Sequence, residues 1–189
     1  MNSVIDRLVG QMILLGAAPE EDADVLVYGL DLLFSSVLTT AALLLIGWMA
    51  GFGLSVLLLL AAFIPLQSFG GGYHCQTHLR CFLMTTCNML AALLLSRLLP
   101  LPILLLTALA AALPLYRIAP VEHPNAPFGE AFGKRMAKIV RAAYLTELAL
   151  ALILSLFGAG HVARPILAAI ILSALSICAA YLKVCGTRA

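Results

Sequence analysis

Charged residues are scarce in this chain, at 11% of 189 residues, whereas 63% of the residues are hydrophobic. Soluble domains carry about 25% charged and about 45–50% apolar residues. One soluble core cannot hide that much apolar surface. The composition therefore excludes a soluble globular domain and predicts that the lipid bilayer surrounds most of the chain.

The sequence also lacks the features of a nucleic-acid-binding protein, of a disulfide scaffold and of a repeat protein. The net charge is only +2 and no basic stripe with interleaved aromatic residues occurs, which excludes a nucleic-acid-binding protein. The five cysteines are odd in number and lack the spacing of a secreted disulfide scaffold, so we expect free thiols on the reducing side of a membrane. No repeat or low-complexity linker divides the sequence, so we expect one domain over residues 1–189, with no cofactor and no resident metal.

Long apolar runs fill most of the chain. A helix needs about 20 residues to cross a bilayer, and the runs predict an all-α integral membrane protein with about six transmembrane helices. We expect these spans at residues 31–50, 54–69, 79–99, 103–118, 139–157 and 165–182, with a polar loop at 119–138 between the fourth and fifth. The second run is short, so we expect it to continue toward Gly72. Its glycines then lie at membrane depth or at the membrane edge, where irregular backbone needs protein or a wet cavity beside it.

The N-terminal residues 1–18 place their apolar side chains on one side of a helix, which predicts an amphipathic helix in the membrane interface. A cleaved signal peptide is the alternative, but Asp6 and the short, broken apolar run argue against it. Pro19 followed by Glu20 and Glu21 marks the start of the next helix.

Six spans would put both termini on one side of the membrane, and the positive residues indicate that this side is the cytoplasm. With the N-terminus inside, the inner segments carry nine of the 11 Lys and Arg residues, and the outer turns carry only Arg97 and Arg164. This asymmetry follows the positive-inside rule. We therefore expect cytoplasmic termini and a multi-pass cell-membrane protein, with residues 67–88 and the 119–138 loop on the cytoplasmic face.

Residues 67–88, QSFGGGYHCQTHLRCFLMTTCN, interrupt the apolar pattern with groups able to do chemistry. A nucleophilic cysteine needs its thiolate form and a partner for the proton. Cys81 lies in the first turns of the third expected span, where unpaired backbone N–H groups and the adjacent Arg80 favour a thiolate. The other four cysteines lack that combination, and we expect them to pack as small apolar residues.

The spacing leaves the partner of Cys81 open between two histidines. His78 lies three residues before Cys81, within reach on one helix. His74 lies seven residues before it, and it reaches Cys81 only if the chain turns, with Thr77 as the N-cap of the helix. The preceding glycines, Gly70 to Gly72, permit close backbone approach and amide groups directed at an oxyanion, or they form a loose hinge.

Two other classes of protein compete with a cysteine enzyme. His74, His78 and Cys81 could bind zinc on one helical face, as in a zinc-dependent membrane peptidase, but Gln76 and Thr77 stand where a catalytic glutamate is needed. A non-enzymatic peptide exporter or assembly subunit would need charged residues along a path through the spans, and the spans are nearly free of them. Arg141 and Glu147 are exceptions, and they can pair only if the helix bends.

The order Gly71-Gly72-Tyr73-His74, six further residues, then Cys81-Phe82 resembles the signature of the accessory gene regulator B family, AgrB. These are membrane cysteine endopeptidases of Gram-positive peptide quorum sensing. The segment APVEHPNAP at 119–127 resembles that family's second cytoplasmic loop, and the length, span number and amphipathic start also agree. The resemblance thus covers essentially the whole chain.

The resemblance implies that Cys81 is the nucleophile and His74 the general base, with His78 a neighbour. It also implies that an AgrD-like precursor peptide is the partner, with a homodimer as one possible assembly. Two positions depart from the family pattern, because Gln67 replaces a common arginine and Ala126 follows Asn125 where positive residues often stand. The expected supporting residues are Gly71 and Gly72, and the candidates for orienting His74 are Glu122, Asn125, Gln67 and Ser68, with Glu122 first.

Overall fold

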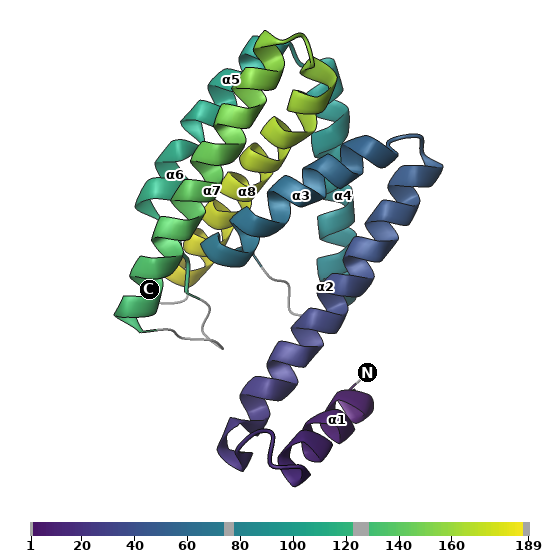
Figure 1. Cartoon of the computed structure of the whole chain (residues 1–189), viewed down its shortest axis with the longest axis vertical. Helices are drawn as coiled ribbons and strands as arrows, with labels where there is room; N and C mark the ends of the chain where they lie inside the picture. Colours follow the sequence, from purple (N-terminus) through teal and green to yellow (C-terminus); the bar gives the residue numbers. More distant parts are fainter. Residues whose placement is uncertain (1, 74–77, 123–128, 187–189) are drawn as a thin grey trace. The chain divides into compact units, whose positions relative to one another are not determined.

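The structure is a computed structural model that describes residues 2–73, 78–122 and 129–186. Every regular element in these ranges is helical, with eight α-helices and one short 3-10 helix (Figure 1). The chain divides into two compact units, residues 1–43 and 44–189. Helix α2 runs across this boundary, and the expectation of a single domain stays a prediction.

The N-terminal unit begins with α1 (Asn2–Leu14). Ile5 and Val9, one turn apart, are buried, whereas Val4 and Leu8 of the same expected face are exposed, as are Asp6 and Arg7, so the expected interfacial helix stays a prediction. A short 3-10 helix, η1 (Glu20–Asp22), follows Pro19 and leads into α2 (Ala23–Met49). The helix start expected at Pro19 is thus confirmed, and the helix that carries the first expected span begins well before residue 31.

The C-terminal unit holds the end of α2 and six further helices. Their bounds are α3 (Gly53–Gly70), α4 (His78–Leu98), α5 (Leu101–Ala110), α6 (Ala112–Arg117), α7 (Glu130–Leu156) and α8 (Gly160–Gly186). Helix α3 continues to Gly70, as its short apolar run required. Helix α7 begins at Glu130, so the expectation of a loop up to residue 138 was wrong. Its first turns are helical despite their polarity, with a Glu130–Lys134 ion pair one turn apart.

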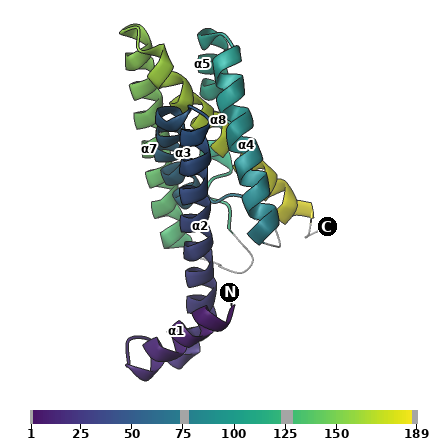
Figure 2. The same cartoon turned by 90° about the vertical axis from the view of Figure 1, so that its right-hand side faces the viewer.

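Helix α8 forms the centre of this unit. It packs on α3, α4, α5, α6 and α7, and Figure 2 shows it passing between α7 and α4. Ala163, Leu167 and Ile170 are wholly buried along it, while leucines such as Leu57 and Leu106 on surrounding helices face outward. Alanines on α8 allow close helix approach, which stabilises bundles in lipid, where burial of apolar surface gives little.

Five helical stretches are long and apolar enough to cross a membrane: Glu20–Met49, Gly53–Gly70, Leu79–Leu98, Glu130–Leu156 and Gly160–Cys185. The fourth expected span, 103–118, is instead the shorter apolar pair α5 and α6, which together cover Leu101–Arg117. Pro114 gives the reason for the break. It has no N–H to donate to the carbonyl of Ala110, where α5 ends, and its ring crowds that carbonyl.

The two ends of the C-terminal unit differ in chemistry. At one end, short turns join α2 to α3, α4 to α5 and α7 to α8. There Arg164 donates hydrogen bonds to the carbonyl oxygens of Ser96 and Leu99, the latter at 2.7 Å, and the Arg97 guanidinium lies 3.9 Å from the ring centroid of Phe52. The opposite end, where α3, α6 and α8 finish and α4 and α7 begin, carries the residues singled out by the sequence.

Candidate functional site

Cys81 lies in the first turn of α4. This helix starts at His78, so Cys81 is its fourth residue, as expected. Its side chain is half-buried, whereas Cys87, six residues further along, is exposed. Backbone N–H groups in the first turn have no helical acceptor, and a thiolate at this position lies near the positive end of the helix dipole. The position suits a nucleophile open to a substrate at the end of the bundle.

The glycine stretch is fixed in place by its backbone. Gly71 has φ 74° and ψ 170°, a conformation that is essentially restricted to glycine, and its N–H donates to the carbonyl of Gln67 at 3.1 Å. A Cβ atom at Gly71 would lie 2.5 Å from the backbone oxygen of Val121. The Gly71 amide thus caps α3 and is not directed at an oxyanion. A loose hinge at this residue is also incompatible with these contacts.

Gln67 and Gly72 are closely packed against each other. A Cβ atom at Gly72 would overlap the Gln67 amide, so a larger residue there would require the Gln67 side chain to move. The Nε2 atom of Gln67 donates to the hydroxyl of Ser176 on α8 at 2.9 Å, and the backbone N–H of Tyr73 donates to the same hydroxyl at 3.2 Å. Ser176 could not be singled out from the sequence, because one serine in an apolar span resembles any other.

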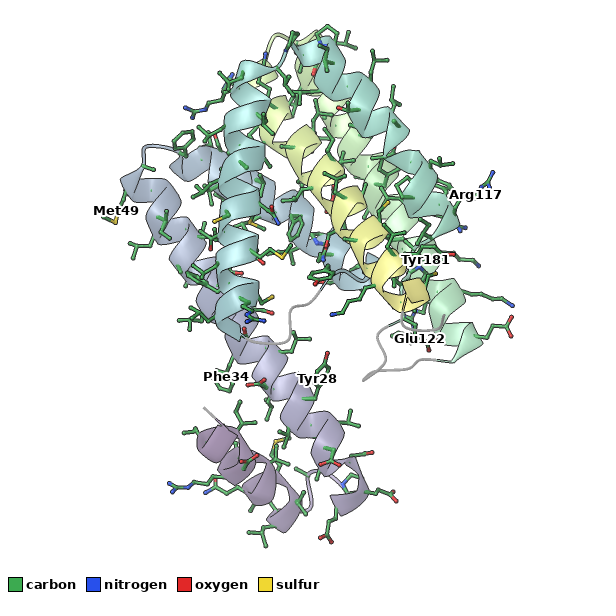
Figure 3. All side chains as sticks on the ribbon, turned by 180° about the vertical axis from the view of Figure 1, so that it is seen from behind. Tyr28, Phe34, Met49, Arg117, Glu122 and Tyr181 are labelled. Atoms are coloured by element: carbon green, nitrogen blue, oxygen red, sulfur yellow. The ribbon has the colours of Figure 1, made fainter. Side chains whose placement is uncertain are left out.

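The segment before the second loop meets the glycine stretch. The Val121 N–H donates to the carbonyl of Gly70 at 3.0 Å, which places Glu122, an exposed residue, at the same end of the unit. Figure 3 shows Glu122 and Tyr181 at this end, below Arg117. The structure therefore brings together Gly71, Gly72, Gln67 and the neighbourhood of Glu122.

Other predicted residues are described only in part. His74 and Asn125, with Thr77 and Cys75, lie outside the described residues, and for His78 only the place at the start of α4 is described. The choice between His74 and His78 thus stays a prediction. Ser68 is exposed on α3. Within the described ranges no cluster of His, Cys, Asp and Glu could hold a metal ion, and the zinc hypothesis stays untested because it depends on His74.

Arg141, on α7, has its partners on α6 and needs no bend in its own helix. Arg141 donates to the carbonyl oxygen of Tyr116 on α6 at 2.9 Å, and its guanidinium lies 5.2 Å from the Tyr116 ring centroid. Tyr116 in turn meets Tyr144 edge to face, with ring centroids 6.2 Å apart. One carboxylate oxygen of Glu147 is buried without a hydrogen-bond partner among the described residues. Arg141 therefore connects α7 to α6 through a hydrogen bond and a cation–π contact.

Comparison with protein families agrees with the motif. The family model AgrB, accessory gene regulator B, matches residues 2–181, which is nearly the whole chain. No curated protein and no solved structure matches. The matched region contains all five candidate spans apart from the last turn of α8, as expected for a multi-pass membrane protein. The chain therefore belongs to the AgrB family, the membrane peptidases that process AgrD precursors in quorum sensing.

Proposed function

We propose that this protein is a membrane cysteine endopeptidase that removes the C-terminal tail of a small AgrD-like precursor through an acyl-enzyme on Cys81. The observation that carries the proposal is the position of Cys81 in the first turn of α4, with a half-buried thiol at the end of the unit that holds the glycine stretch. AgrB membership supports the same chemistry.

In the proposed reaction, the Cys81 thiolate attacks the carbonyl carbon of the scissile peptide bond, and His74 accepts the thiol proton. The tetrahedral intermediate collapses, the C–N bond breaks, and His74 gives its proton to the leaving amine. The C-terminal tail departs with a new amino terminus. The rest of the precursor stays on Cys81 as a thioester.

A cysteine or serine side chain within the bound precursor then attacks this thioester. The new bond closes a thiolactone or lactone ring and frees the Cys81 thiol, so no net oxidation or reduction occurs. Water would instead hydrolyse the thioester to a linear acid. A site among membrane helices limits the access of water and favours the ring.

Charge supports a cytoplasmic site with both termini inside the cell. Among the described Lys and Arg residues of the C-terminal unit, two lie at the end with the short turns, Arg97 and Arg164. The other seven lie on helices toward the end with Cys81: Arg80, Arg117, Lys134, Arg135, Lys138, Arg141 and Lys183. Cytoplasmic segments carry such an excess.

Glu122 is the residue we assign to orienting the His74 imidazole. It carries charge, it is exposed, and it follows Val121, whose N–H bonds to Gly70. An acidic partner that holds one ring nitrogen would leave the other facing the thiol. Asn125 is the alternative from the same loop.

The test is co-expression of the chain with the small open reading frame beside its gene, followed by mass spectrometry of the precursor. We expect Cys81→Ala and His74→Ala to abolish cleavage and Cys81→Ser to leave little. Cys87→Ala is the matched control, because Cys87 lies on the same helix and is exposed. This variant should cleave the precursor at the wild-type rate. Processing that survives Cys81→Ala would overturn the proposal.

A further inference from the structure

The hydroxyl of Ser176 is the point at which three segments meet. It accepts hydrogen bonds from the Gln67 amide of α3 and from the backbone N–H of Tyr73. A serine hydroxyl has two acceptor lone pairs, and these two bonds occupy both. Ser176 therefore connects the end of α3 and the segment after the glycines to the central helix α8.

Tyr73 directly precedes His74 in the sequence. Tyr73 is also the last residue that the structure describes before that histidine. Two other bonds hold the same stretch, from the Gly71 N–H to Gln67 and from the Val121 N–H to Gly70. Both join backbone to backbone. The contact through Ser176 differs from them, because a substitution of one side chain removes it.

Two neighbours reinforce this contact. The Gln67 amide lies so close to Gly72 that a side chain at residue 72 would displace the amide from Ser176. The Lys183 ammonium, two turns beyond Ser176 on α8, lies 4.8 Å from the ring centroid of Tyr73. Helix α8 thus contacts Tyr73 through both its backbone and its ring.

We propose that Ser176 is a positioning residue, whose hydroxyl fixes the Tyr73 backbone and the glycine stretch before it against α8, at the end of the unit that holds Cys81. This inference rests on the proposed function, which assigns Cys81 as the nucleophile. Ser176 itself touches no reacting atom. Its loss should therefore lower turnover and leave precursor binding nearly unchanged.

The chain offers a close control in Ser173, one turn earlier on α8. It is wholly buried, and its hydroxyl has no hydrogen-bond partner among the described residues. Ser173→Ala therefore removes the same atom from the same helix without breaking a contact to the glycine stretch. Ser176→Thr keeps the hydroxyl and serves as the rescue variant.

We expect Ser176→Ala to lower kcat for precursor cleavage at least about tenfold with KM changed less than about threefold. Ser173→Ala should stay within about twofold of wild type, and Ser176→Thr should recover most of the lost turnover. Wild-type kcat in Ser176→Ala would overturn the inference. So would an equal loss in Ser173→Ala, since this would indicate a general effect on α8.

Hydrogen exchange provides a readout that does not depend on activity. Loss of the Ser176 acceptor should speed amide exchange in a peptide ending at Tyr73, and Ser173→Ala should leave that rate unchanged. Unchanged exchange in Ser176→Ala would show that the contact does not hold the backbone. Cys81→Ala assayed in parallel separates the two hypotheses, because cleavage by that variant defeats the proposed function whatever the exchange result.

Discussion

Single residues decide the geometry of the glycine stretch. Gly71 adopts a backbone conformation closed to other residues and lies against the Val121 carbonyl, while Gly72 leaves space for the Gln67 side chain. The sequence suggested that these glycines matter, since three in a row precede a histidine. It could not indicate that packing, more than flexibility, is the reason, because the contacting residues come from distant parts of the chain.

Gly71→Ala should therefore reduce both stability and processing. The substitution costs about 1–3 kcal/mol for the backbone conformation, and the clash with Val121 adds to this. Gly158→Ala is the control, since Gly158 also has positive φ, 76°, but has no atom within 4 Å of an added Cβ. We expect Gly158→Ala to lower only the thermal midpoint in detergent. Equal processing by the two variants would contradict the structural account of Gly71.

The helices are the part of the structure that the sequence predicted best. Runs of apolar residues predicted five of the six spans, because a bilayer demands uninterrupted hydrocarbon of fixed length. The remaining one, 103–118, is also apolar and helical but is divided into α5 and α6 at Pro114, whose effect on the carbonyl of Ala110 hydropathy does not register. The helix start signalled by Pro19 and the acidic residues after it is confirmed by η1 and α2, whereas the start at Glu130 was missed because its polar first turn lies outside an apolar run. The start of α4 near Cys81 was placed correctly.

The start of α4 predicts a difference in thiol reactivity between two cysteines of one helix. Cys81 lies in the first turn, near unpaired N–H groups that favour a thiolate. Cys87 lies two turns further along, where the helix has no such groups. We expect iodoacetamide to modify Cys81 before Cys87 at neutral pH, although Cys87 is the more exposed. Peptide mass spectrometry measures both rates, and faster modification of Cys87 would contradict the prediction.

At the opposite end, Arg164 on α8 stabilises the last turn of α4 through the carbonyl oxygens of Ser96 and Leu99. Charged hydrogen bonds contribute about 2 kcal/mol, so Arg164→Met should lower the thermal midpoint clearly while folded protein keeps its kcat. Arg97→Met loses only a cation–π contact to Phe52, worth about 0.5–1 kcal/mol at an exposed position. A larger shift for Arg97→Met would contradict this assignment.

For the whole molecule, the distribution of charge between the two ends of the C-terminal unit was readable from the sequence, but the arrangement of its helices was not. Leu57 faces outward and Leu167 is wholly buried, yet both are leucines in apolar spans. Hydropathy cannot separate lipid-facing from protein-facing residues in a membrane. The central place of α8, and with it the role of Ser176, therefore needed the structure.

The proposed orientation in the membrane rests on the charge asymmetry and is directly testable. In a cysteine-free background, a cysteine at Gly158 should react with a membrane-impermeant maleimide on intact cells. A cysteine at Lys134 should react only after permeabilisation, because cytoplasmic segments carry the Lys and Arg excess. The reverse pattern would place the Cys81 end outside the cell and contradict the cytoplasmic site.

The central claim is that Cys81 carries the acyl-enzyme, and trapping that intermediate tests it most directly. A precursor whose ring-forming side chain is replaced by alanine cannot complete the second step, so the thioester should accumulate. We predict a hydroxylamine-sensitive mass increase equal to the N-terminal part of the precursor, located on the peptide containing Cys81 and absent in Cys81→Ala. Cleavage of the precursor with no adduct on Cys81, or with an adduct on another residue, would contradict the account.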